Sequence, residues 1–500
     1  MVSAVLFITF FVLLVLNVPI AVCLGLSSAA AILYSGTSLT IVATNIYSGI
    51  SKFLLLAIPF FVLSGNIMAK AGISTRLIRF VDTCVGHRKG GIANVCIIVA
   101  CFFGAISGSG PATVAALGAV LIPAMVERGG FSAAFSTALM ATSSSIAIVI
   151  PPSIAFVVYA SITGVSIGDM FMAGIIPGIL MGLALVVVVM LEVRRNHVVP
   201  SNVEKASAKE RWNAFKDAFW GFLMPIIILG GIYGGFFTPT EAAAVSVVYG
   251  LFVGMVIYKE VKFKDLWEIL IDSAKTTGGI MLIVACASLF SFVCTRFGIS
   301  TAASELLARV AGNQFTFLLI CNIIFLIAGC FIDANSAMYI FIPIMLPVCK
   351  ALGYNVIAFG IMATVNLAIG QVTPPVGVNL FVAIGIKLRD GIRVTLQEIS
   401  RAVVPMVAAS IAVLLIITYI PQISTCLPAA LGSAAAIEND ETVGGDSGTT
   451  QTDNDDFNTI GDYSDLDWAD MTWNFTCSTT ETSTWAQAGR KFGELMEQAT

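Results

Sequence analysis

The stretch MATSSSIAIVIPP (residues 140–152) places a run of hydroxyl residues and then a proline pair inside a long apolar block. A similar stretch, MATVNLAIGQVTPP, occupies residues 362–375. The triplet Met-Ala-Thr recurs at an offset of 222, and the proline pair recurs at an offset of 223. A proline pair in mid-helix removes backbone donors and clashes with the preceding turn. Both stretches therefore predict interrupted helices.

Two further landmarks recur at nearly the same offset and in the same order. GIST at 72–75 returns at 298–301, and LIP at 121–123 matches MLP at 345–347. Such self-similarity indicates an internal repeat. We expect the pair of segments in 218–258 to repeat the pair in 4–34 around Pro19, which would place the copies on opposite faces. The sequence thus predicts two inverted repeats.

The composition describes a chain that is mostly lipid-soluble. Its hydrophobic fraction is 57% and its charged fraction 11%, against about 25% charged residues in soluble domains. Since a membrane span needs about 20 apolar residues, we predict an all-α polytopic membrane protein. This excludes a soluble enzyme, a nucleic-acid binder and a disulfide-built secreted domain. The apolar blocks are 4–34, 53–69, 91–126, 133–191, 219–258, 277–294, 316–349, 355–386 and 402–420.

The charges are divided along the chain. Residues 1–425 hold 24 Lys/Arg and 16 Asp/Glu, whereas residues 426–500 hold 2 and 14. Basic loops at 194–216, 259–264 and 387–401 should be cytoplasmic, and the acidic tail should then be extracytoplasmic. The predicted organisation is a first repeat, a basic cytoplasmic connector, a second repeat, an acidic linker and a short terminal segment: 1–193, 194–217, 218–425, 426–470 and 471–500.

The sequence offers little for metal or redox chemistry. The 11 cysteines include no Cys-x-x-Cys pair, and only His87 and His197 are present. We interpret the cysteines as small core residues. At 238–241, Thr-Pro-Thr-Glu has the composition of a capping box, so Glu241 is interpreted first as a cap and second as a site residue.

Polar and small residues gather where an irregular backbone is expected. GAISGSGPAT (residues 104–113) is typical of the tip of a re-entrant helical hairpin, and its counterpart is Asp333-Ala-Asn-Ser336. Within a membrane, irregular backbone lasts only where protein covers it or where it lines a cavity. Free carbonyls with Ser, Thr and Asn oxygens form a neutral cage for cations, and helix N-termini favour a carboxylate. Sodium suits such a site better than protons, because Asp333 is the acidic residue in these segments.

Each pattern also has a structural explanation. The small residues at 107–110 are typical of a helix contact, and the hydroxyls at 142–145 can bond to their own helix. Asp333 can cap a hairpin arm, pair with a basic residue or line the site. A site is indicated because these patterns occur together at matched positions of two repeats.

At these residues the chain resembles the large membrane subunit of tripartite ATP-independent periplasmic (TRAP) transporters. The matching stretches are IPFFVLSGN at 58–66, GAISGS at 104–109 with Ala112-Thr113, LGGIYGGFFTPTEAAA at 229–244 and QVTPPVGVN at 371–379. The resemblance covers residues 1–425. It implies an elevator-type secondary transporter of the bacterial inner membrane with sodium sites at two hairpin tips.

The resemblance also implies which residues bind the ions and the cargo. Sodium would bind at Ser107, Ser109, Thr142, Ser143, Ser144, Asn335, Thr364, Asn366, Gly370 and Thr373. The organic anion would bind at Ser109, Thr113, Asn335, Asn366 and Thr373. The implied partners are a soluble periplasmic substrate-binding protein and a small four-helix membrane subunit, whose sequence we do not expect in this chain. No organic cofactor is expected.

The tail departs from this family. Residues 429–470 are acidic and polar, as in a disordered linker, and 471–500 resemble the first strand and helix of a TRAP substrate-binding protein. The tail is then either the start of a fused binding protein or a remnant. The expected function is sodium-coupled uptake of a small organic acid, such as a dicarboxylate, keto acid or sugar acid. The alternatives are a stand-alone sodium/divalent-anion symporter and an intramembrane enzyme or channel.

Overall fold

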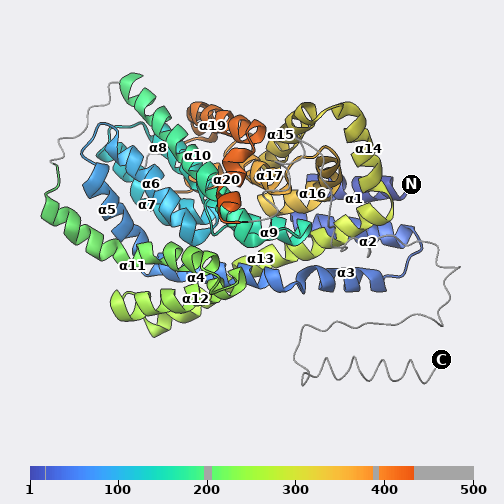
Figure 1. Ribbon diagram of the computed structural model, residues 1–500, viewed down its shortest axis with the longest axis horizontal. Helices are drawn as coiled ribbons and strands as arrows, with labels where there is room; N and C mark the ends of the chain where they lie inside the picture. The colour runs from blue at the N-terminus through green and yellow to red at the C-terminus, as the bar shows by residue number, and fades with distance from the viewer. Residues whose placement is uncertain (17, 196–204, 387–393, 433–500) are drawn as a thin grey trace. The chain divides into compact units, whose positions relative to one another are not determined.

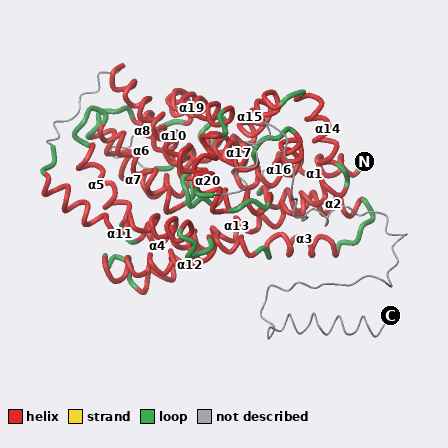
Figure 2. The backbone as a smooth tube through the Cα atoms, viewed as in Figure 1, coloured by secondary structure: helices red, strands yellow, loops and turns green. Residues whose placement is uncertain are grey.

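The computed structural model describes residues 1–16, 18–195, 205–386 and 394–432, which belong to one compact unit, Met1–Val443. The described residues form helices joined by loops, without a strand among them (Figures 1 and 2). Nine of these helices are long and apolar enough to cross a membrane, judged by length and composition. Predictions about the tail after residue 432 and about the basic residues 387–393 fall outside the described residues.

In the described residues, the first half contains eleven α-helices or 3-10 turns before the connector. A twelfth element, the helix α10, ends within the connector. These elements are α1 (Val2–Val15), α2 (Ile20–Tyr34), α3 (Thr40–Ile50), η1 (Phe53–Leu56), α4 (Ala57–Lys70), α5 (Ile73–Val85), α6 (Gly91–Ser107), α7 (Gly110–Glu127), α8 (Ala133–Ser145), η2 (Ile146–Ile148), α9 (Ile154–Thr163) and α10 (Ile167–Arg195).

The second half repeats this order. Its elements are α11 (Ala208–Tyr233), α12 (Pro239–Phe252), the π-turn η3 (Val253–Ile257), α13 (Phe263–Arg296), α14 (Ile299–Ala311), α15 (Gln314–Phe331), α16 (Ala334–Ala351), α17 (Val356–Gly370), α18 (Val378–Ile384), α19 (Leu396–Tyr419) and α20 (Gln422–Ala430). Because Ser207 and Glu210 form a capping box, α11 begins inside the segment that the sequence assigned to the connector.

The internal repeat is visible in local backbone geometry. Gly72 and Gly298 have φ of 67° and 68° and stand directly before α5 and α14. This left-handed region favours glycine. The prolines of the LIP and MLP landmarks, Pro123 and Pro347, lie inside α7 and α16. The landmarks therefore mark equivalent helices of two repeats.

One pair of equivalent segments differs between the repeats. The second half has a single long helix, α13, whereas the first half divides the same stretch into α3, η1 and α4. The division falls at Lys52, whose ammonium donates a 2.6 Å hydrogen bond to the Ser161 carbonyl oxygen. Partial burial lowers the pKa of Lys52. Helix α13 packs along α2, α3 and α4, and α12 packs on α4 (Figure 1).

The central helices are α8 and α17. Residues 135–145 and 357–370 are buried without interruption. A helix that is apolar nearly all round belongs in the interior, and these two helices end a few residues before the proline pairs. The sequence therefore places its interrupted helices at the centre of the protein.

A short helix of each half packs against the other half. Helix α9 of the first half packs on α16 of the second, and α18 of the second packs on α7 and α8 of the first. The Tyr159 hydroxyl donates to the Val356 carbonyl oxygen at 2.6 Å, and Ser161 shares a 3.0 Å hydrogen bond with Tyr339. The fold is an all-helical polytopic architecture of two inverted repeats with helical hairpins and interrupted helices, as predicted.

Candidate functional site

Both predicted helix interruptions are present. Helix α8 ends at Ser145, and after one 3-10 turn the chain bends through Pro151-Pro152 before α9 begins. Helix α17 ends at Gly370, and the chain bends through Pro374-Pro375 before α18. Both Pro-Pro bonds are cis. We call these segments, residues 146–153 and 371–377, the first and second breaks.

Both predicted hairpins are present as well. Helices α6 and α7 form hairpin 1, which turns at Gly108 with φ of 60°. Its tip is closed by hydroxyls, because Ser107 Oγ lies 2.8 Å from Thr113 Oγ1 and Thr113 donates to the Ser109 carbonyl oxygen at 2.8 Å. Helices α15 and α16 form hairpin 2.

Hairpin 2 is capped by Asp333. Its carboxylate accepts hydrogen bonds from the backbone N–H groups of Asn335 and Ser336 at 3.0 and 3.2 Å. Of the three roles considered for Asp333, capping is the one observed. The equivalent N-cap of hairpin 1 is Ser109, whose side chain makes no cap hydrogen bond. The positive end of α7 thus keeps more of its partial charge than that of α16.

Each hairpin tip contacts the break of its own repeat. A Cβ atom added to Gly108 would lie 2.8 Å from the Pro152 carbonyl oxygen. In the second repeat, Gly377 N–H donates to the Cys330 carbonyl oxygen at 3.2 Å. Backbone groups of the hairpin tips and of the breaks therefore meet at two equivalent places.

The hydroxyls of Thr142, Ser144, Ser145 and Thr364 bond back to their own helices, whereas that of Ser143 does not. Thr142 donates to the Ala138 carbonyl oxygen at 2.9 Å, and Thr364 donates to that of Gly360 at 2.7 Å. The structural explanation of these hydroxyls is thus confirmed. It uses only the proton of each group, however, and leaves the oxygen lone pairs free to accept a cation. Thr142 also faces the sulfur of Met406 at 3.6 Å.

Several side-chain oxygens around the breaks are buried and have no hydrogen-bond partner. They are Ser143 Oγ, Asn335 Oδ1, Asn366 Oδ1, Gln371 Oε1 and Asn379 Oδ1. An unpaired buried acceptor costs about 1–3 kcal/mol. The buried polar side chains in the described part of the chain are Ser, Thr, Asn and Gln, with no charged residue among them. These oxygens are therefore neutral acceptors, which suit a monovalent cation more than a proton relay.

The structure places the predicted residues on the hairpins, the interrupted helices and the second break. Ser107, Ser109 and Thr113 share hydrogen bonds at the tip of hairpin 1, while Ser143 and Ser144 end α8 beside the first break. In the second repeat, Asn366 donates to the Asn322 backbone and side-chain oxygens at 2.9 and 2.8 Å.

Two other predicted residues, Gly370 and Thr373, contact backbone atoms of the second repeat. The Thr373 hydroxyl donates to the Ile369 carbonyl oxygen at 2.7 Å, so its proton is used within the second break. Gly370 contacts Gly329 of α15 through the backbone. Within the described part of the chain, no hydrogen bond joins Ser109 to Asn335, and Asn335 Oδ1 has no partner.

Sequence reasoning missed Asn322 and Asn379. Asn379 donates to Ser144 Oγ at 3.1 Å from the other half of the chain. An offset of 223 places the apolar Val99 and Phe156 opposite these asparagines, so neither belongs to a pair of polar positions that recurs in both repeats. A search for isolated Asn residues in apolar segments would have found both.

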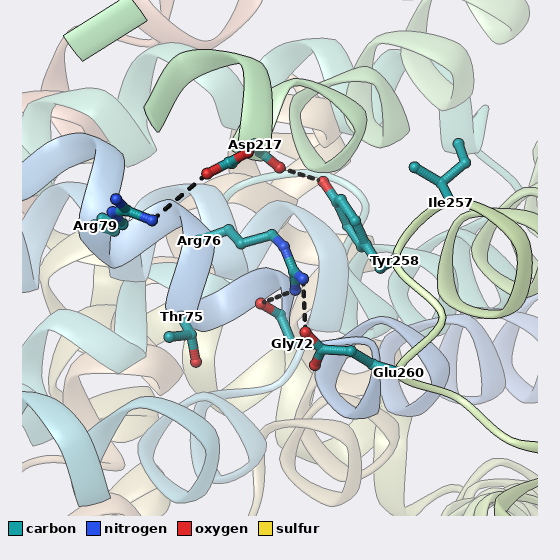
Figure 3. Close-up of a pocket in the computed structure, with 8 residues that line it drawn as sticks. All are labelled: Gly72, Thr75, Arg76, Arg79, Asp217, Ile257, Tyr258 and Glu260. Carbon is teal, nitrogen blue, oxygen red and sulfur yellow. Dashed lines mark hydrogen bonds and ion pairs between the residues drawn. The ribbon is translucent and has the colours of Figure 1, made fainter. Parts of the chain in front are cut away.

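A separate cavity of about 420 Å³ lies where α5 meets α11 and the segment from the end of η3 to Glu260 (Figure 3). Arg76 pairs with Glu260 at 2.6 Å, and its guanidinium lies 3.9 Å from the centre of the Tyr258 ring. Tyr258 donates to the Asp217 carbonyl oxygen at 2.6 Å. No predicted site residue lines this cavity. At this cavity Asp217, the last residue of the predicted connector 194–217, lies next to the basic loop at 259–264.

Glu241 is a cap, as first interpreted. Its carboxylate accepts from Thr238 N–H at 2.8 Å, and the Thr238 hydroxyl accepts from Glu241 N–H at 3.3 Å. Both residues start α12 at an exposed position, away from the breaks.

Comparisons with known proteins agree with this geometry. Residues 7–423 match the family model described as tripartite ATP-independent periplasmic transporter, DctM component. The chain is 38% identical over 436 residues to the C4-dicarboxylate TRAP transporter large permease protein DctM of Rhodobacter capsulatus, covering 84% of this chain and 97% of that protein. It is 40% identical to the isethionate TRAP transporter permease protein DctMQ of Oleidesulfovibrio alaskensis, covering 84% and 65%.

One solved structure supports the fold alone. The YdaH transporter of Alcanivorax borkumensis aligns with a TM-score of 0.55 at 15% identity, covering 78% of this chain and 88% of that one. The family model and the relatives, which are named as transporter permeases, define a multi-pass membrane transport protein. The chain belongs to the DctM family of large permease subunits of TRAP transporters.

Proposed function

We propose that this permease couples the uptake of a small organic acid to sodium ions that bind beside the two breaks. The observation that carries the proposal is the set of buried, neutral and unpartnered oxygens at Ser143, Asn335, Asn366, Gln371 and Asn379. Such oxygens can replace the hydration shell of sodium. A proton-coupled carrier would require titratable groups at these positions.

The organic anion is assigned to the region between the hairpin tips, at Ser109, Thr113, Asn335, Asn366 and Thr373. The N-terminus of α7 is the better position for the carboxylate, because Ser109 leaves it without a side-chain cap. The N-terminus of α16 already has the Asp333 carboxylate. Sodium bound beside each tip would offset the negative charge of the cargo.

The cargo is a dicarboxylate, keto acid or sugar acid in this proposal. The relatives named for a C4-dicarboxylate and for isethionate are about equally similar to this chain. The permease sequence therefore carries little of the information that selects one acid. A periplasmic binding protein would supply the selectivity and deliver the cargo, and a small four-helix membrane subunit would complete the complex in the bacterial inner membrane. The tail after residue 432 would be periplasmic.

The proposed movement is of the elevator type. The hairpins, the breaks, α9 and α18 interlock across the two halves, which favours motion of these elements as one body. Helices α2, α3, α4, α12 and α13 pack on one another and would serve as the scaffold.

Uptake into proteoliposomes tests this function. The chain is reconstituted with its small subunit, and uptake of radiolabelled organic acids is measured with the binding protein outside. Uptake should require an inward sodium gradient and should not respond to internal ATP. Choline in place of sodium controls for osmotic effects.

Two results would reject parts of the proposal. Full uptake with choline in place of sodium would show that uptake is not coupled to sodium. Full uptake without binding protein would instead indicate a stand-alone sodium/divalent-anion symporter.

A further inference from the structure

Asn379 lies at the start of α18, fully buried, and reaches into the other half of the protein. Its Nδ2 donates to Ser144 Oγ at 3.1 Å. Ser144 gives its own proton to the Ala141 carbonyl oxygen at 2.6 Å, so it must accept from Asn379. This fixes the orientation of the amide and leaves its Oδ1 buried without a partner.

The same side chain lies against hairpin 1. A Cβ atom added to Gly110 would lie 2.7 Å from Asn379 Nδ2 and 3.0 Å from its Oδ1. The amide therefore contacts both the tip of hairpin 1 and the end of α8, the two elements beside which the proposed function places one sodium ion.

The backbone of Asn379 belongs to the second break. Its N–H donates to the Gln371 carbonyl oxygen at 3.1 Å, at the end of α17. Gly377, two residues earlier, donates to Cys330 in hairpin 2 at 3.2 Å. One short segment, residues 371–379, thus contacts both hairpins and both interrupted helices.

We propose that Asn379 is a positioning residue that couples the two sodium sites. A cation at hairpin 1 restricts the motion of Ser144 and of the Asn379 amide. Because the turn from Gln371 to Asn379 is rigid, the backbone of the second break is then restricted as well. The second cation then binds to a site that is already ordered, so its entropy cost is smaller. This inference rests on the proposed sodium coupling. The first repeat has Phe156 at the position equivalent to Asn379. The connection between the two sodium sites therefore comes from the second repeat alone.

Sodium titration of the full chain, purified with its small subunit, tests the coupling. Binding of ²²Na⁺ and the sodium-dependent rise in melting temperature are measured for wild type, Asn379→Leu and Asn66→Leu. Asn66 is the matched control, because its Nδ2 also donates to a serine of the other half, Ser273, at 2.8 Å, but between α4 and α13.

The wild type should titrate with a Hill coefficient approaching about 2, and Asn379→Leu with about 1. The half-saturating sodium concentration of Asn379→Leu should rise by about fivefold or more, while saturating occupancy is kept. Asn66→Leu should keep the wild-type Hill coefficient. Asn379→Ser, which is smaller and still polar, should show the same loss of cooperativity and serves where Asn379→Leu does not fold.

Two results would overturn the coupling: an unchanged Hill coefficient in the Asn379 variants, or an equal loss in Asn66→Leu. A wild type that ignores sodium would instead reject the proposed function. The failures are therefore distinguishable.

Discussion

Gly329 and Gly370 face each other backbone to backbone, and a Cβ atom on Gly370 would lie 2.5 Å from the Gly329 Cα atom. The first repeat has the same arrangement, since a Cβ atom on Gly104 would lie 2.6 Å from the Ala147 Cα atom. An arm of the hairpin thus meets the first break in the first repeat and the end of α17 in the second. This close approach places each hairpin tip beside its break.

Gly370→Ala should therefore separate α15 from α17. We expect a loss of about 1–3 kcal/mol in the free energy of unfolding, as for overpacked cores, and a large fall in uptake. Thermal unfolding in detergent and proteoliposome uptake measure the two effects. Gly279→Ala, in α13, is the control because a Cβ atom there meets nothing within 4 Å. Equal behaviour of the two variants would contradict the packing argument.

Ser109→Ala should weaken sodium dependence without destabilising the fold, because the Ser109 side chain makes no cap hydrogen bond. Ser132 is the matched control, an N-cap serine of the same repeat whose hydroxyl accepts from Phe135 N–H at 3.2 Å. Ser132→Ala should cost about 1 kcal/mol and leave the sodium requirement unchanged. Sodium activation curves and melting temperatures measure both effects. The ligand role of Ser109 is wrong if its variant has the wild-type sodium curve.

Asn366→Leu should reduce both stability and sodium binding. It leaves the Asn322 side-chain oxygen buried without its donor, at a cost of about 1–3 kcal/mol. The double variant Asn322→Leu/Asn366→Leu removes both partners and should recover much of the stability, yet still bind sodium weakly. Sodium binding that recovered together with stability would show that Asn366 has only a structural role.

Gly72→Ala and Gly298→Ala compare one backbone conformation in two environments. Both residues have positive φ, which costs a side chain about 1–2 kcal/mol. A Cβ atom on Gly72 would in addition lie 2.3 Å from the Glu260 carboxylate, whereas Gly298 has nothing within 4 Å. Gly72→Ala should therefore be the more destabilising, by about 1 kcal/mol or less, because the Arg76–Glu260 pair is partly exposed. Melting temperatures in one detergent decide the order, and the reverse order would contradict it.

Glu241→Gln should support normal uptake, because glutamine also completes a capping box. Thr238→Ala, which removes the reciprocal hydroxyl, should lower the melting temperature and leave the sodium dependence unchanged. Loss of sodium-dependent uptake in Glu241→Gln at unchanged stability would instead make Glu241 a site residue.

The helices, the hairpins and both breaks could be predicted because their signals are local. Proline pairs, glycine clusters and long apolar runs act through the backbone within a few residues. The two-fold recurrence of Thr142 and Thr364 then strengthened each signal. Contacts between distant segments leave no such pattern, which is why Asn322 and Asn379 were missed.

The amino-acid sequence by itself determined the membrane environment, the repeat and the positions where helices must stop, because hydropathy and backbone sterics depend on residue type. Only the tertiary structure decided which oxygens remain unpaired, that Asp333 caps α16 while Ser109 leaves α7 uncapped, and that α9 and α18 cross into the opposite half. Those outcomes depend on which groups meet after packing. A hydroxyl or an amide becomes a ligand only when its neighbours leave its lone pairs free.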